Sequence, residues 1–116
     1  MRSCWLDSRD ETCCQNAIAS GKKALAYYQQ AGPDWAKNDM AFDAIHKRIE
    51  DFAEQVGKMS DELQAAHPEF PFARIRKTRN VLAHDYAHVR VQFIQEALDI
   101  HLPANVSALE QWLASS

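Results

Sequence analysis

Eight consecutive residues in the C-terminal half of the chain, Arg79 to Tyr86 (RNVLAHDY), carry the side chains best suited to chemistry. An Arg presents a planar fork of donors that fits phosphate oxygens. A His titrates near neutral pH, so it can move a proton at an attacking or leaving oxygen. Arg74, Arg76 and Lys77 come just before, which places four cations within six positions. This combination indicates chemistry at a phosphodiester.

These cations are concentrated in a chain that is acidic as a whole, with a net charge of −3. Residues 72 to 92 include five Arg or Lys and one acidic residue, a local charge of +4 that leaves −7 for the remainder. The chain is therefore not a polycation that binds nucleic acid through bulk charge. The pattern predicts a local patch that holds a few phosphates.

The function that these residues predict is cleavage of RNA without a metal ion or other cofactor. His84 would act as the base on a ribose 2′-hydroxyl or as the acid at the leaving oxygen, while Arg79 would stabilise the charge on the phosphate. Asn80 would orient the phosphate or His84, and Arg76 and Lys77 would bind neighbouring phosphates. Such cleavage leaves a 2′,3′-cyclic phosphate and requires RNA, because DNA lacks the 2′-hydroxyl.

The spacing of the motif imposes a geometric condition. On a regular helix, with about 100° per residue, Tyr86 lies within about 20° of Arg79, whereas His84 is rotated by about 140°. Arg79 and His84 are thus poorly placed to hold one phosphate from the same straight helix. Either the helix ends or bends between them, or a second copy of the chain completes the site in a two-fold dimer.

Two other interpretations of the motif remain open. From the spacing alone, a surface Arg in an ion pair and a structural His at a helix end are the commoner outcome, because an Arg and a His five apart occur often. His84 and His88 also stand at i and i+4, as in zinc-binding helices, but His101 is the one downstream candidate for a third ligand. We therefore predict no metal site.

The composition predicts one all-α domain over residues 1–116, with residues 1–7 as a loose arm. Hydrophobic residues make up 47% and charged residues 25%, with three Gly and four Pro, as in an ordinary globular protein. No apolar run has the length of a membrane span, and no signal peptide is expected, which favours a cytoplasmic protein. Cys4, Cys13 and Cys14 are predicted to be reduced thiols, acting as small buried apolar side chains.

Helical periodicity predicts an antiparallel bundle of four to five helices. The first helix would have Ser8 as its N-cap and end at Gly32; its predicted apolar stripe is Cys14, Ile18, Gly21, Leu25 and Tyr28. After a connector over 34–39, a core helix is predicted over 39–59; its stripe is Ile45, Ile49, Phe52, Val56 and Met59.

Prolines mark the predicted helix boundaries in the second half of the chain. A short helix beginning at Ser60 cannot pass His67-Pro68, so His67 is expected to be structural. Pro71 precedes the motif helix, predicted from Phe72 to His84 or Val89. A further helix is marked by Val91, Ile94, Leu98 and Leu102 and is predicted to be interrupted at Pro103, before a final turn or two.

From Asp39 to Leu113 the chain resembles the HepT-like toxins of the HEPN superfamily. The order is a long helix with Val56-Gly57, then His67-Pro68-Glu69 and Pro71-Phe72, then Arg-Asn-x-x-x-His-x-Tyr from Arg79 to Tyr86, then Leu102-Pro103. That order covers about two thirds of the chain and is more specific than the Arg and His alone. Family members commonly have Gly-Glu where this chain has Gly57-Lys58, and many have Trp in place of Phe72.

The resemblance implies a helical bundle that acts as a homodimer, with the motif in the dimer cleft. Arg79 and His84 match the catalytic pair, and Asn80 matches the polar residue that often follows the Arg. Tyr86 matches the tyrosine that a partner, a minimal nucleotidyltransferase antitoxin, AMPylates to silence the toxin. The resemblance thus implies a ribonuclease toxin of a type VII-like toxin–antitoxin system acting on RNA. The alternative is a non-catalytic HEPN module that binds nucleotide or scaffolds a nucleotidyltransferase.

Overall fold

The computed structural model describes residues 6–115 except 85–90, and it does not describe the side chain of His84. The described residues form helices and no strand, which confirms the predicted all-α bundle. The elements are α1 (Ser8–Ala31), η1 (Gly32–Lys37), α2 (Asp39–Gly57), α3 (Asp61–Ala66), α4 (Phe72–His84), α5 (Val91–Glu96), η3 (Ala97–His101) and α6 (Leu102–Ser115). None of the helices within this part of the chain is long and apolar enough to cross a membrane.

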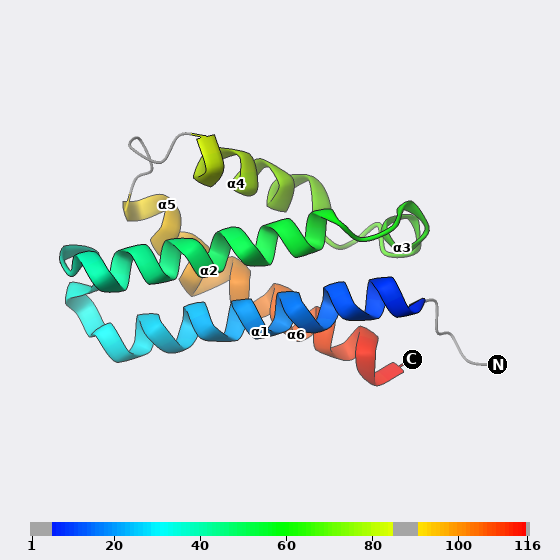
Figure 1. Cartoon of the computed structure of the whole chain (residues 1–116), viewed down its shortest axis with the longest axis horizontal. Coiled ribbons are helices and arrows are strands. Elements are labelled where there is room, and N and C mark those ends of the chain that lie inside the picture. Colours follow the sequence, from blue (N-terminus) through cyan, green and yellow to red (C-terminus); the bar gives the residue numbers. More distant parts are fainter. Residues whose placement is uncertain (1–5, 85–90, 116) are drawn as a thin grey trace.

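The long helices α1 and α2 run antiparallel and form the base on which the other helices pack (Figure 1). The predicted stripe of α2 is confirmed, because each of its five side chains is at most 3% exposed; they are Ile45, Ile49, Phe52, Val56 and Met59. Burial of a large apolar side chain contributes roughly 1.5–3 kcal/mol, so this stripe anchors α2 between α1 and α4.

The buried face of α1 agrees only in part with the predicted one, of which Cys14 and Gly21 are buried. Ile18, Leu25 and Tyr28 are only partly buried, and small residues occupy most of the core-facing stripe; they are Cys13, Cys14, Ala17, Ser20, Gly21 and Ala24. The reason is the close approach of α6. A Cβ built on Gly21 would lie 2.6 Å from Cγ2 of Val106. The close approach of α6 thus decides which face of α1 is buried, and the positions of the largest apolar side chains do not.

The predicted N-cap of α1 was wrong by one residue. Asp7, not Ser8, caps the helix, and its carboxylate accepts a hydrogen bond from the backbone N–H of Asp10 at 2.8 Å. Asp10 itself is buried and accepts two hydrogen bonds from Ser60, from the backbone N–H at 2.9 Å and from the hydroxyl at 2.6 Å. Because the hydroxyl of Ser60 also caps α3, this carboxylate ties the start of α1 to the start of α3.

The predicted connector over 34–39 is mostly a 3₁₀ helix, η1, whose Trp35 is buried. The indole N–H of Trp35 donates to the side-chain oxygen of Gln95 at 2.9 Å. The amide nitrogen of Gln95 donates to the hydroxyl of Tyr28 and to Asp99. This network holds α5 and η3 against the far end of α1.

The predicted interruption at Pro103 was also wrong, because the chain remains helical from Val91 to Ser115. The five residues of η3 form a π-helical turn in which the backbone N–H of Leu102 donates to the carbonyl of Ala97. Pro103 has no N–H to donate, and its ring would clash with a carbonyl four residues earlier in a regular α-helix. The wider turn accommodates Pro103 in the first turn of α6.

Candidate functional site

The helix that carries the start of the motif, α4, forms as predicted from the sequence. Pro71 precedes it, and Ile75 and Leu82, seven residues apart, are 5% and 2% exposed, so one narrow stripe faces the core. That stripe packs on α2. The helix begins at Phe72 as predicted and is described as far as His84, while the farther predicted end, Val89, lies outside the described residues. The remaining face of α4 is free to present polar groups.

One flank of α4 borders a surface hollow of about 250 Å³ at the C-terminal end of α2. Arg76 and Arg79 line it from α4, and Glu54, Gly57 and Lys58 line it from α2 and its C-cap. Among the described residues, none of the three cations and neither oxygen of Glu54 takes part in an ion pair. The hollow therefore has an excess of uncompensated positive charge, which suits a phosphate.

Arg79 is oriented by its neighbour in the chain. Its Nη2 donates to Oδ1 of Asn80 at 3.0 Å. Arg79 is half-buried at the edge of the hollow, while Asn80, Arg76 and Lys77 are exposed. Since a guanidinium has five N–H donors, the bond to Asn80 leaves most of them available. Lys77 does not line the hollow.

Arg79 and His84 lie on the same described helix. The helix α4 is continuous from Phe72 to His84, so it does not end between the two residues, and a bend or a second copy of the chain are the predicted alternatives that stay. On such a helix the Cα atoms are about 140° apart around the axis and about 7.5 Å apart along it. Tyr86, Asp85 and His88 lie outside the described residues. The structure thus brings Arg76 and Arg79 together with Lys58, without placing the side chain of His84.

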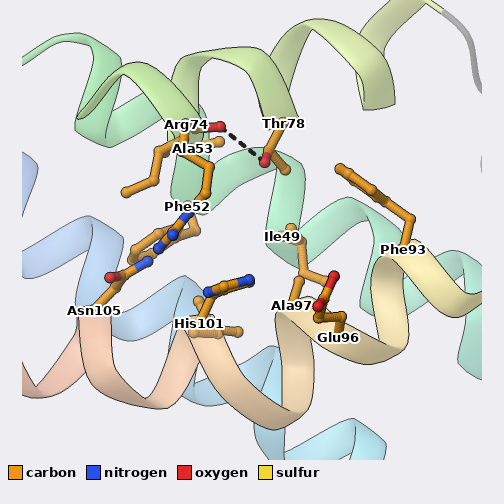
Figure 2. Close-up of a pocket in the computed structure, with 12 residues that line it drawn as sticks. Ile49, Phe52, Ala53, Arg74, Thr78, Phe93, Glu96, Ala97, His101 and Asn105 are labelled. Carbon is orange, nitrogen blue, oxygen red and sulfur yellow. Dashed lines mark hydrogen bonds between the residues drawn. The ribbon is translucent and has the colours of Figure 1, made fainter. Parts of the chain in front are cut away.

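The opposite flank of α4 borders a second cavity, which the sequence analysis missed. Arg74 and Thr78 line it from α4, and Phe93, His101 and Asn105 line it from the helices that follow (Figure 2). The signal that marks it in the sequence is a polar residue at a core position. Asn105 stands three residues after Leu102 and one before Val106, both of which are buried.

The other chemistry-bearing residues have structural surroundings. Cys13 and Cys14 are buried free thiols; burial, with the nearby charge of Asp10, raises the pKa of Cys14 to about 12. Cys4 is outside the described residues. The ring of His67 stacks on Trp112 with centroids 4.0 Å apart, in agreement with a structural role. Within 6–84 and 91–115, no group of three His, Cys, Asp or Glu residues is arranged to hold a metal ion.

Comparison with known families matches residues 18–112 to the family described as Ribonuclease HepT-like. The match extends from the middle of α1 to the last turns of α6, and so includes the hollow, the cavity and the whole Arg79 to Tyr86 motif. Searches of curated proteins and of solved structures found no match to the chain.

Proposed function

The chain belongs to the HepT-like ribonuclease family, and on that premise we propose that it is a ribonuclease toxin of a type VII-like toxin–antitoxin pair. The observation that carries the proposal is the hollow beside the motif. Arg76, Arg79 and Lys58 converge there without ion-pair partners among the described side chains. A phosphate in the hollow would be next to the family's motif on the same helix.

In the proposed reaction, no metal ion is needed. His84 takes the proton of a ribose 2′-hydroxyl, the 2′-oxygen attacks the adjacent phosphorus, and the bond from phosphorus to the 5′-oxygen breaks. A protonated His84 returns a proton to the leaving 5′-oxygen, so the products are a 2′,3′-cyclic phosphate and a 5′-hydroxyl. Arg79 donates to the phosphate oxygens as negative charge accumulates on them. Arg76, Lys58 and Lys77 hold the flanking phosphates.

We further propose that the site is shared between two copies of the chain. Because α4 is continuous between Arg79 and His84, one chain presents these residues in directions about 140° apart. A two-fold axis that sets two α4 helices side by side would let Arg79 of one copy and His84 of the other face the same phosphate. The homodimer cleft is thus the proposed place of the reaction.

The proposed regulator is a cognate minimal nucleotidyltransferase that AMPylates Tyr86. Tyr86 is two positions after His84 in the sequence. An AMP group there would add a phosphate charge and a nucleoside near cations that otherwise hold RNA. Modification would therefore oppose RNA binding by occupying the positive patch and by filling space.

The test is cleavage of a 5′-labelled RNA by purified wild-type chain, Arg79→Ala and His84→Ala, with analysis of the new ends. Lys23→Ala, an exposed cation on α1, is the matched control. We expect 2′,3′-cyclic ends from the wild type and the control, and a loss of at least about 100-fold in both motif variants. A 2′-deoxy substrate should resist all four proteins. Equal rates in all four on RNA would rule out catalysis by this pair. An absence of cleavage together with nucleotidyltransferase binding would favour the non-catalytic module.

A further inference from the structure

The second cavity lies between α2, α4 and the continuous helical segment from α5 to α6 (Figure 2). Arg79 lines the hollow on the other flank of α4. Its volume is about 150 Å³. Its floor is apolar and well packed; the floor residues are Ile49, Phe52, Ala53, Ile75 and Leu102. A cavity of this volume with an apolar floor accepts a flat aromatic ring, since an engineered apolar cavity of about 150 Å³ in another protein binds benzene.

One polar side chain at this cavity, that of Asn105, is mostly buried and has no hydrogen-bond partner among the described residues. Asn105 is 7% exposed, yet its side chain makes no hydrogen bond with any residue in the described part of the chain. Figure 2 shows it directed from α6 toward the space that His101 and Arg74 also border. The amide atoms of Asn105 are not among the fully buried polar atoms without a partner, so they border the open space of the cavity. The amide of Asn105 thus presents one donor and one acceptor to a ligand.

The rim of the cavity carries an aromatic ring and charged side chains. Phe93, at the mouth, is 37% exposed, which is high for a large aromatic side chain. Arg74 stands on the α4 side of the rim, and Glu96 stands on the α5 side. Neither forms an ion pair within the described residues. The cavity therefore combines a stacking surface, a buried amide, a cation for phosphate and a carboxylate that accepts from an amino group.

We propose that this cavity binds an unpaired nucleobase of RNA and prefers adenine. An Asn amide pairs with adenine through two hydrogen bonds, accepting from the exocyclic amino group and donating to N7. Proteins that read single-stranded RNA commonly stack its unpaired bases on aromatic rings, and Phe93 offers such a ring at the mouth. Arg74 would hold the phosphate of the same nucleotide, and Glu96 would favour a base that has an amino group over uracil.

The base site rests on the proposed function in one respect, because its ligand is taken to be the RNA that the motif cleaves. The cavity and the Arg79 hollow lie on opposite flanks of α4. A helix with its side chains is about 10–12 Å across. At about 3.4 Å per stacked nucleotide, a strand crosses α4 in roughly three nucleotides. At about 100° per residue, Lys77 and Asn80, which are exposed, fall on the face of α4 between these two flanks. The base that is read would thus be a few nucleotides from the phosphate in the hollow.

Binding of uncleavable RNA tests the base site independently of catalysis. The probes are two fluorescein-labelled, fully 2′-O-methylated strands, a short oligouridine and the same strand with one central adenosine. We expect the adenosine to raise the affinity of the wild-type chain by about tenfold. Asn105→Leu should remove the difference between the two strands. Phe93→Ala should reduce the difference in affinity between the two strands, and the variant should fold because the position is exposed. Met40→Ala is the control and should keep the difference in affinity between the two strands. Met40 is 83% exposed and lines neither the cavity nor the hollow.

Each other outcome overturns a definite part of the proposal. Equal affinity of the wild type for both strands, or a folded Asn105→Leu chain that keeps the tenfold ratio, removes the base site. If adenosine 5′-monophosphate binds through Asn105 while the two strands bind equally, the cavity takes a free nucleotide and the RNA assignment fails. A wild-type chain that cleaves no RNA but prefers the adenosine strand would remove the catalytic proposal and leave the base site standing.

Discussion

Arg79 donates from Nη2 to Oδ1 of Asn80 at 3.0 Å, so two consecutive residues of α4 are joined through their side chains as well as their backbone. The bond fixes the plane of a half-buried guanidinium at the edge of the hollow that Arg76 and Lys58 also line. A phosphate bound there would meet a donor fork that is already oriented, which lowers the entropy lost on binding and on reaction.

The first prediction follows from this bond. Asn80→Ala should lower the single-turnover rate of RNA cleavage by about tenfold, because the guanidinium of Arg79 would lose its fixed orientation. The free energy of unfolding should change by less than about 0.5 kcal/mol, since Asn80 is exposed. Urea unfolding and a cleavage time course measure the two quantities. Asn16→Ala, at an exposed position on α1, is the matched control. A full rate in Asn80→Ala would refute the orienting role.

The second prediction concerns the shared site. Arg79→Ala and His84→Ala chains, each inactive alone, should regain activity when they are unfolded together and refolded as a mixture. Half of the dimers would then be mixed, and in each mixed dimer one of the two sites has both residues, so about a quarter of the wild-type activity should return. Refolding each variant separately is the control. If the mixture stays inactive although mixed dimers form, both residues must come from one chain.

The third prediction concerns the hollow. Arg76→Ala and Lys58→Ala should each weaken the binding of single-stranded RNA. Each should also reduce the slope of log K against log salt by about 0.7, which is the effect of one lost phosphate contact. Lys23→Ala, on α1 and away from the hollow, should leave the slope unchanged. Fluorescence anisotropy over a range of salt concentrations measures it. Unchanged slopes in both hollow variants would place the RNA elsewhere on the chain.

The sequence predicted the parts of the fold in which side-chain size and periodicity agree. The stripe of α2 has large apolar residues at every step, so its burial follows from spacing alone. On α1 the two signals disagree. The larger Ile18 and Leu25 were predicted to face the core, but Ala17 and Ala24 do so beside the correctly predicted Gly21, because only small residues allow α6 to approach. That choice depends on a helix about 80 residues away in the sequence, and no local pattern contains it.

The candidate site, too, was predicted only in part from the sequence. The cations of α4 are visible in the sequence, and the hollow collects Arg76 and Arg79, which were predicted to contact phosphates. Lys58 was noted only as a departure from the family pattern, since its proximity to Arg79 depends on how α2 packs against α4. Asn105 was missed because its local signal, a polar residue at a core position, does not by itself distinguish a binding residue from a structural one. Its importance depends on a cavity formed by three separate segments.

The fourth prediction concerns the dependence of stability on pH. Burial of His46 lowers its pKa below the usual 6.5, although Glu50 and Asp43 act in the opposite direction. The unfolded chain then binds a proton at His46 more readily than the folded chain does, so stability should fall as the pH drops below about 6.5. In His46→Gln this contribution is absent, and the loss of unfolding free energy between pH 7 and pH 5 should be smaller. Urea unfolding at several pH values measures the difference. An identical pH profile in wild type and variant would contradict the shift.

The fifth prediction concerns the close approach of α1 and α6. Gly21→Ala should destabilise the chain by about 1–3 kcal/mol, because the added Cβ would lie 2.6 Å from the stiff, β-branched side chain of Val106. Gly57→Ala is the matched control. Nothing lies within 4 Å of a Cβ at that position, so the same substitution at the end of α2 should stabilise by up to about 1 kcal/mol. Adding Val106→Ala to Gly21→Ala should cost less than the two single changes predict by addition, since it removes the clashing methyl groups. Urea unfolding of the four variants decides the matter. Additive losses, or a neutral Gly21→Ala, would show that α6 can move away from α1 without penalty.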